Sequence, residues 1–172
     1  YGSGYIALEF AGIFNGLGAR THLIYRGDFP LRGFDEDVRR HVATAMTDRG
    51  INLYPKTTVD SVTAKNDRRM ARLSDGSALD VNEFMAATGR RPNTDGLGLG
   101  DIGVDCGEQG EIVVDATSKT NVPGIYAVGD ATNRINLTPV AIAEGHAFAD
   151  SEFGNLKRVA DHASVASAVF SQ

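Results

Sequence analysis

The chain has 172 residues, of which 42% are hydrophobic and 23% are charged, the proportions of an ordinary soluble globular protein. Its formal net charge of −5 argues against a nucleic-acid-binding surface, because such surfaces need clustered positive charge. No run approaches the roughly 18 apolar residues of a membrane helix, and a single cysteine, Cys106, excludes an internal disulfide and a cysteine-based zinc site. These features favour a cytoplasmic protein that binds neither nucleic acid nor membrane.

The chain opens on a glycine-rich turn, Gly2-Ser3-Gly4-Tyr5-Ile6-Ala7. A Gly-x-Gly-x-x-Ala turn lets the backbone approach a pyrophosphate and points the N-terminus of the following helix at it. The predicted apolar face of this helix, which Gly18 would end, consists of Ile6, Phe10, Ile13, Phe14 and Leu17. Such a turn normally follows a buried strand, so we expect the chain to be part of a longer protein that continues upstream of Tyr1.

A buried parallel strand is predicted over Thr21–Tyr25, and Arg26 follows it. In dinucleotide-binding folds an acid at this place accepts a hydrogen bond from the adenosine 2′-hydroxyl, whereas an arginine pairs with a 2′-phosphate. Arg32 lies a few residues further on, so two guanidinium groups could close on one phosphate. Most surface arginines are merely solvated, but the carboxyl edge of a sheet is where ligands bind. The predicted coenzyme is therefore NADPH.

A second helix and a second strand continue the alternation. Asp35 is the predicted N-cap of the helix, and Gly50 is predicted to end it. The predicted apolar face of this helix consists of Val38, Val42, Ala45 and Met46. The next strand is predicted over Ile51–Tyr54. This order predicts an α/β fold with a Rossmann-like, doubly wound domain.

From Thr58 to Val81 the pattern changes to short alternating runs, which predict an antiparallel β-meander with turns at Asn66-Asp67 and Asp75-Gly76. The other predicted elements are a strand over Glu83–Thr88, a loop with one short helical turn over Thr94–Gly110, strands over Ile112–Val114 and Ile125–Val128, and a helix from Thr138 to about Phe153.

Asp130 ends a second dense motif, Ile125-Tyr126-Ala127-Val128-Gly129-Asp130. A short strand followed by Gly-Asp is either a simple turn or a way to deliver a carboxylate that accepts hydrogen bonds from ligand hydroxyls. A Thr-Pro helix start follows, and the N-terminus of that helix can stabilise negative charge on the same ligand. No metal site is predicted, because three histidines lack carboxylate or cysteine partners at metal spacing: His41, His146 and His162.

Several motifs, in this order, resemble those of the flavin-dependent disulfide reductases, the glutathione reductase family. The resemblance spans nearly the whole chain and is carried by residues 4–9 (Gly-Tyr-Ile-Ala-Leu-Glu), 25–35, 87–93 (Ala-Thr-Gly-Arg-Arg-Pro-Asn), 125–130 and 137–142 (Leu-Thr-Pro-Val-Ala-Ile). It implies an NADPH-binding domain over residues 1–91 without its first strand, the C-terminal part of an FAD-binding domain over 92–157, and the truncated start of a dimer-interface domain over 158–172. The full-length protein is then expected to be a homodimer.

The resemblance also implies which residues contact NADPH and FAD: Gly2, Gly4, Tyr5, Ile6, Ala7, Glu9, Arg26, Arg32, Gly89, Asp130, Leu137 and Thr138. In the NADPH half, the glycines and Ala7 form the pyrophosphate turn, and the two arginines hold the 2′-phosphate. Tyr5 resembles the aromatic gate over the flavin, and Glu9 resembles the acid that contacts the nicotinamide carboxamide. The segment Ala166–Phe170 resembles the first strand of the interface domain, whose backbone lies near the nicotinamide.

In the FAD half, Asp130 matches the aspartate on the ribityl chain, and Leu137 and Thr138 match the helix start at the flavin pyrimidine edge. The implied reaction runs from NADPH to FAD, then to a redox-active cysteine pair, then to a small-molecule disulfide. The cysteine pair and the catalytic base lie outside this chain, so the fragment alone is expected to be inactive.

Two alternatives remain for the substrate and the class of protein. Leu-Thr-Pro-Val-Ala at 137–141 favours glutathione disulfide, whereas Tyr-Arg-Gly-Asp at 25–28 and Ser-Lys-Thr-Asn-Val at 118–122 are close to trypanothione reductases. A non-catalytic NADPH-binding module is the alternative from a different class. An upstream Cys-x-x-x-x-Cys segment would favour the enzyme.

Overall fold

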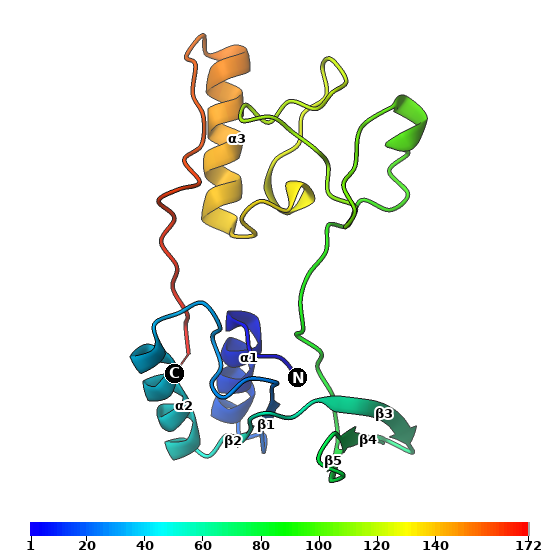
Figure 1. Cartoon of the computed structure of the whole chain (residues 1–172), viewed down its shortest axis with the longest axis vertical. Helices are drawn as coiled ribbons and strands as arrows, with labels where there is room; N and C mark the ends of the chain where they lie inside the picture. Colours follow the sequence, from blue (N-terminus) through cyan, green and yellow to red (C-terminus); the bar gives the residue numbers. More distant parts are fainter. Residues whose placement is uncertain (172) are drawn as a thin grey trace. The chain divides into compact units, whose positions relative to one another are not determined.

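The computed structural model describes residues 1–171 and divides into two compact units (Figure 1). Unit 1 contains residues 1–89 together with the last residues from Ala168 onward, and unit 2 contains residues 90–167. The predicted domain limits at residues 91 and 157 stay predictions. No helix in the described part of the chain has both the length and the apolar character that crossing a bilayer requires.

Unit 1 begins with the predicted alternation of helices and strands. Its first elements are α1 (Tyr5–Gly16), β1 (His22–Ile24), α2 (Glu36–Asp48) and β2 (Asn52–Tyr54). β1 and β2 pair in parallel, with Leu23 opposite Leu53. Asp35 caps α2 by accepting hydrogen bonds from two backbone N–H groups, as predicted. Gly18 and Gly50 follow the two helices with φ of 88°, a value that a glycine adopts without strain.

The rest of unit 1 contains the predicted antiparallel meander. Its strands are β3 (Val59–Lys65), β4 (Arg68–Leu73) and β5 (Ala78–Val81), in the spatial order β3-β4-β5. The turn between β3 and β4 falls at the predicted place, with Asn66 in the left-handed region (φ 54°). Figure 1 shows this small sheet as a separate layer beside β1 and β2.

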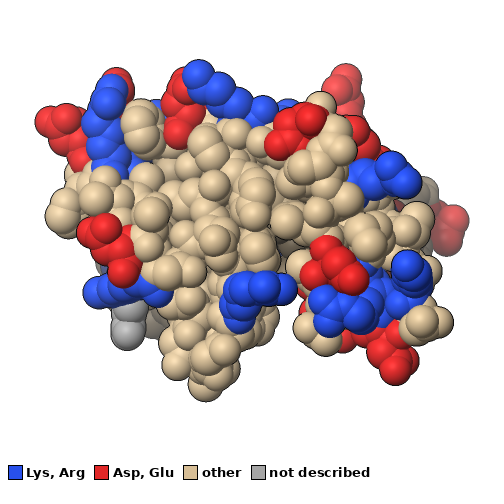
Figure 2. All heavy atoms as spheres, turned by 90° about the horizontal axis from the view of Figure 1, so that it is seen from below, with Lys and Arg blue, Asp and Glu red and all other residues tan. Residues whose placement is uncertain are grey.

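The prediction of the buried face of α1 is wrong. The helix buries Ala7, Leu8 and Ala11. The bulky residues predicted to be buried are exposed: Phe10 by 40%, Ile13 by 51%, Phe14 by 41% and Leu17 by 80%. The periodicity predicted the helix but not its buried face, because apolar residues occur on several sides of α1. The side that packs against the core contains Ala7, Leu8 and Ala11. Figure 2 shows that the face seen from below has a broad centre without charged side chains, with charges around its rim.

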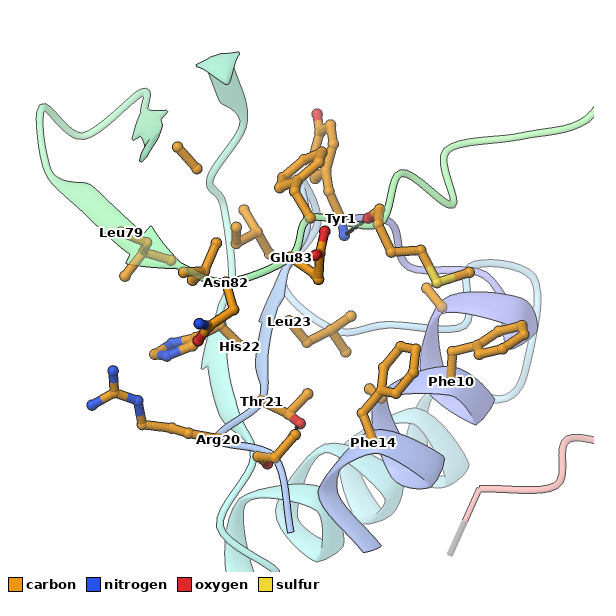
Figure 3. Close-up of a pocket in the computed structure, with 18 of the residues that line it drawn as sticks. Tyr1, Phe10, Phe14, Arg20, Thr21, His22, Leu23, Leu79, Asn82 and Glu83 are labelled. Atoms are coloured by element: carbon orange, nitrogen blue, oxygen red, sulfur yellow. Dashed lines mark hydrogen bonds between the residues drawn. The ribbon is translucent and has the colours of Figure 1, made fainter. Parts of the chain in front are cut away.

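A cavity of about 450 Å³ lies beside the exposed side of α1 (Figure 3). Phe10 and Phe14 line one side of it, Leu23 of β1 lies across from them, and residues 79–85 with Ala87 form more of the wall. Tyr1 lies at this wall: its amino group donates to the Met85 carbonyl oxygen (2.8 Å), and its carbonyl oxygen accepts from the N–H of Ala87 (2.7 Å).

The predicted strand over Glu83–Thr88 is not formed. This segment has no assigned secondary structure, and most of its residues are exposed. Its backbone hydrogen bonds join Met85 and Ala87 to Tyr1, and the segment borders the cavity. A run of apolar residues becomes a strand only when a ladder partner is present on at least one edge. The predicted upstream strand stays a prediction.

Unit 2 consists mainly of loops around one long helix. Its elements are the 3₁₀ helices η1 (Gly100–Ile102) and η2 (Gly129–Thr132) and the helix α3 (Thr138–Phe153), and both η1 and α3 were predicted. The predicted strands Ile112–Val114 and Ile125–Val128 are wrong, since only isolated bridges form there, Cys106–Ile112 and Lys119–Tyr126. A small core forms around Val104, Ile112 and Ala127.

Candidate functional site

The N-terminus of α1 is open toward solvent. Gly4 is the N-cap residue, no side chain caps the helix, and its first turn contains no acidic residue. Gly4 is exposed, and a Cβ placed on it would meet no atom within 4 Å. The first N–H groups of a helix lack intrahelical partners, and the helix dipole makes this end partly positive. The turn therefore offers donors and free space to an anion, and a pyrophosphate fits this donor set.

Gly2 joins the turn to the sheet. Its N–H donates to the Ile24 carbonyl oxygen (3.0 Å), and its φ is 141°. A Cβ on Gly2 would lie 2.2 Å from the Ala87 carbonyl oxygen, closer than any side chain can approach a backbone atom. Only glycine fits here. The buried Ala7 lies next to this site, within 3.4 Å of the same Cβ position.

A loop from Arg26 to Arg32 follows β1 and is bound to the glycine turn. The N–H of Leu31 donates to the carbonyl oxygen of Ser3 (2.7 Å), and the Leu31 side chain is 2% exposed in the core. Leu31 has a φ of 55°, which is uncommon for a residue with a side chain. The structure thus brings the predicted phosphate-binding loop and the predicted pyrophosphate turn together.

Arg26 and Arg32 lie at the two ends of this loop and are both exposed. Within the described residues, neither guanidinium makes an ion pair or a hydrogen bond, whereas nearby Arg40 pairs with Glu36. The only acid between the two arginines, Asp28, is paired with Lys56 (2.7 Å), and this hydrogen bond and charge lower the pKa of Asp28 below its usual value. Two unpaired guanidiniums are thus available to an anion.

Glu9 and Tyr5 lie on the first turns of α1, where the sequence places them on one face. The carboxylate of Glu9 accepts a hydrogen bond from the backbone N–H of Phe170 (3.0 Å). Val169 packs against the core of unit 1, and so does half-buried Tyr5. The last described residues therefore belong to unit 1, beside the predicted nicotinamide acid. Ile6, which follows Tyr5 in α1, is half-buried, and Gly89, exposed and with φ of 154°, ends the first segment of unit 1.

In unit 2, Asp130 lies in η2 and is half exposed. Its carboxylate pairs with Arg90 at 3.5 Å. The N-terminus of α3 also lacks a side-chain cap and an acidic residue in its first turn, with Leu137 as N-cap and Thr138 exposed. A half-exposed carboxylate and an uncapped helix start are suited to ligand hydroxyls and to negative charge, respectively. These donors and acceptors fit the FAD contacts predicted for Asp130, Leu137 and Thr138.

Sequence reasoning missed a buried carboxylate, Glu144, inside α3. Its side chain is 1% exposed, accepts hydrogen bonds from the N–H of Gly129 (2.6 Å) and from His162 Nε2 (2.6 Å), and forms an ion pair with the Arg134 guanidinium (2.9 Å). Burial opposes ionisation of Glu144, but the hydrogen bonds from Gly129 and His162 and the charge of Arg134 outweigh it and lower the pKa of this carboxyl. One signal was available: an acid stands in the apolar run Ala141-Ile142-Ala143-Glu144.

Within the described residues, no group of three or more His, Cys, Asp or Glu side chains gathers closely enough to hold a metal ion. His22, in β1, makes a hydrogen bond through Nδ1 with the Tyr54 hydroxyl in β2 (3.1 Å). Burial, with Arg20 nearby, lowers the pKa of His22. Cys106 is an exposed free thiol.

Comparison with known proteins identifies the family. Residues 1–145 match the family description "Pyridine nucleotide-disulphide oxidoreductase". The chain belongs to this family. It is 51% identical over 171 residues to a glutathione reductase of Burkholderia cepacia, and 43% identical over 174 residues to a trypanothione reductase of Trypanosoma congolense. These matches cover 99% of this chain but only 38% and 35% of the two relatives.

The fold comparison agrees. The crystal structure of LpdA from Mycobacterium tuberculosis superposes with a TM-score of 0.89 at 29% identity, covering 99% of this chain and 37% of that one. The resemblance to flavin-dependent disulfide reductases and the Rossmann-like α/β fold class are therefore confirmed. The individual cofactor-contacting residues stay predictions.

Proposed function

We propose that this chain is the coenzyme-binding part of an NADPH-dependent flavoprotein that reduces glutathione disulfide. In the reaction proposed, NADPH supplies a hydride to FAD, and a cysteine pair outside this chain passes the electrons to the disulfide. The residues of this chain bind and orient the two cofactors. The N-terminus of α1 binds the NADPH pyrophosphate, and Arg26 and Arg32 bind the 2′-phosphate.

One observation carries the coenzyme choice. Arg26 and Arg32 are exposed and unpaired among the described residues, at the two ends of a loop that is hydrogen-bonded to the glycine turn through Leu31. An unpaired guanidinium pair beside an uncapped helix N-terminus favours a ligand with two separate phosphate groups, and NADPH carries a pyrophosphate and a 2′-phosphate whereas NADH lacks the second. The family relationship supports the same choice, since the relatives named above are glutathione and trypanothione reductases.

The test replaces Arg26 or Arg32 by Gln in the natural polypeptide that carries this chain and measures the Kd of NADPH and of NADH. Each charge-assisted phosphate contact contributes about 1.5–3 kcal/mol, so each variant should bind NADPH about tenfold more weakly or worse. NADH binding should hardly change. Arg40→Gln is the control, because Arg40 lies nearby but is paired with Glu36. Equal losses for NADPH and NADH would refute the phosphate assignment.

The substrate proposal is glutathione disulfide, with trypanothione disulfide as the second candidate. The identity of 51% to a glutathione reductase against 43% to a trypanothione reductase supports this order. Steady-state kcat/KM for the two disulfides, measured on the natural polypeptide, decides between them. A higher kcat/KM for trypanothione disulfide would reverse the order.

The remaining proposals concern the whole protein. The family resemblance supports a homodimer. The single free cysteine supports a cytoplasmic location, where thiols stay reduced. The chain itself contains one cysteine and so cannot supply a redox pair. We therefore expect the isolated chain to show no turnover of NADPH with glutathione disulfide, and sustained turnover would contradict this assignment. A non-catalytic NADPH-binding module is the alternative if the natural polypeptide has no Cys-x-x-x-x-Cys segment.

A further inference from the structure

Arg39 on α2 holds the backbone of the loop between the two predicted phosphate-binding arginines. Its Nε donates to the carbonyl oxygen of Pro30 (2.7 Å), and its Nη2 donates to the carbonyl oxygen of Phe29 (2.8 Å). A guanidinium presents its donors in a rigid planar fork, so it can bind two successive carbonyl groups at once. Arg39 is half-buried, unlike the exposed Arg26 and Arg32. Its Nε and Nη2 are engaged by backbone carbonyl oxygens of the protein.

The residue that follows this contact adopts an unusual backbone conformation. Leu31 has a φ of 55° and is 2% exposed, with its N–H bound to Ser3 and its carbonyl oxygen accepting from the N–H of Phe34 (3.1 Å). The left-handed region is disfavoured for a residue with a side chain, so it persists only where the surroundings hold it. Arg39 supplies that hold immediately before Leu31, and the core supplies it at the Leu31 side chain.

The two phosphate-binding arginines are therefore fixed by different parts of unit 1. Arg26 follows Tyr25, whose N–H donates to the Tyr54 carbonyl oxygen (3.0 Å) and whose carbonyl oxygen accepts from Thr57 (3.0 Å), so the parallel sheet holds it. Arg32 directly follows Leu31, so its Cα is placed by the Arg39 contacts and the left-handed turn. Loss of the Arg39 fork would free the Arg32 end of the loop and leave the Arg26 end in place.

We propose that Arg39 is a positioning residue for coenzyme selection, which holds residues 29–31 so that Arg32 meets the 2′-phosphate. This inference rests on the proposed NADPH function and adds a residue that does not itself contact the coenzyme. The Nε and Nη2 atoms of Arg39 already donate to carbonyl oxygens of the loop. Its effect on the phosphate comes from the geometry of the loop rather than from its own charge.

A pair of variants distinguishes an effect of loop geometry from an effect of the positive charge of Arg39. Arg39→Lys keeps the positive charge but replaces the planar fork by a single ammonium, whereas Arg39→Met removes both. Arg49→Met is the matched control, because it removes one positive charge just after the same helix, at its C-cap, away from the loop. The measurements are the Kd of NADP⁺ and of NAD⁺ on the flavin-loaded natural polypeptide, and hydrogen exchange of the Leu31 and Phe34 amides.

Both Arg39 variants should bind NADP⁺ about tenfold more weakly while their affinity for NAD⁺ stays within about twofold of the wild type. The amides of Leu31 and Phe34 should exchange faster in both, and that of Tyr25 should not. Arg49→Met should match the wild type. If Arg39→Met fails to fold, Arg39→Lys alone decides.

Three results would overturn the inference. Normal NADP⁺ affinity in Arg39→Lys would show that only charge matters, and equal losses of NADP⁺ and NAD⁺ affinity would show a general structural role. Unchanged exchange of Leu31 would show that the fork does not hold the loop. If the wild type itself binds NADP⁺ and NAD⁺ equally, the proposed function fails and the inference with it. If the wild type discriminates and the variants do so equally well, the inference alone fails.

Discussion

Replacement of Glu144 by Gln removes the charge from the most buried acid of unit 2. The wild-type carboxylate accepts hydrogen bonds from the Gly129 N–H and from His162, and it forms an ion pair with Arg134. Glutamine keeps the shape but offers only one acceptor oxygen, so the partly buried Arg134 loses its counter-charge. Breaking a buried charge pair by removing one partner costs about 3–5 kcal/mol. We expect the free energy of unfolding to fall by about 3 kcal/mol, since Arg134 is 23% exposed and water replaces part of the lost contact.

The assay is urea unfolding of the natural polypeptide, followed by circular dichroism and by release of flavin. Asp150→Asn is the control on the same helix, where an ion pair of 2.7 Å with Arg158 is partly exposed. Exposed pairs contribute about 0–1 kcal/mol, so the control should stay close to the wild type. If Glu144→Gln is destabilised no more than Asp150→Asn, the cluster of Gly129, Arg134 and His162 around Glu144 does not stabilise unit 2 and the reasoning fails.

The same cluster predicts a pH dependence. The pKa of Glu144 is lowered in the folded chain, whereas in an unfolded chain a glutamate has a pKa of about 4.3. A lowered carboxyl pKa stabilises the fold above the unfolded value, and this contribution is lost as the pH falls through the folded pKa. The stability difference between the wild type and Glu144→Gln should therefore shrink as the pH falls below about 4.3. A difference that grows in acid would contradict the assigned ionisation state.

Other variants test the remaining features. Gly2→Ala places a Cβ 2.2 Å from the Ala87 carbonyl oxygen and should abolish or strongly weaken NADPH binding in a calorimetric titration, while normal affinity would disprove the close approach. Asp35→Ala removes the N-cap of α2 and should lower the free energy of unfolding by about 0.5–2 kcal/mol, and a smaller loss in urea titration would mean that the cap is replaced. Asp130→Asn should weaken FAD binding about tenfold if the carboxylate accepts hydrogen bonds from ligand hydroxyls. The measurement is the fluorescence of flavin released at equilibrium, and an unchanged value would contradict this role of Asp130.

Local sequence signals predicted the helices and the turns well. Asp35 and Gly50 mark the ends of α2 through contacts within a few residues, and the turn at Asn66 depends on its own backbone preference. The segment Glu83–Thr88 could not be judged in the same way, because strand formation depends on a partner that the local sequence does not specify. The predicted strand over Ile112–Val114 was wrong for the same reason.

The candidate site divides along the same line. The glycine turn and Arg26 could be predicted as coenzyme contacts because their spacing is fixed by one helix and one strand. The roles of Arg39 and Glu144 could not be predicted, because they come from contacts with backbone groups that lie elsewhere in the chain. A charged residue that binds a distant carbonyl or N–H leaves no periodic signal in the sequence, since only folding brings its partner near.

The hydrogen bond between Glu9 and Phe170 joins residues 161 positions apart, and the whole of unit 2 lies between them in the sequence. During synthesis, α1 leaves the ribosome long before the segment that meets it, so unit 2 can become compact while unit 1 still lacks its last contact. Closing such a long loop adds little entropic penalty over a shorter one, because that penalty grows only with the logarithm of loop length. The contact has high contact order, and we expect it to form late in folding. The acid predicted to meet the nicotinamide would then acquire its backbone partner only after the rest of the chain has folded.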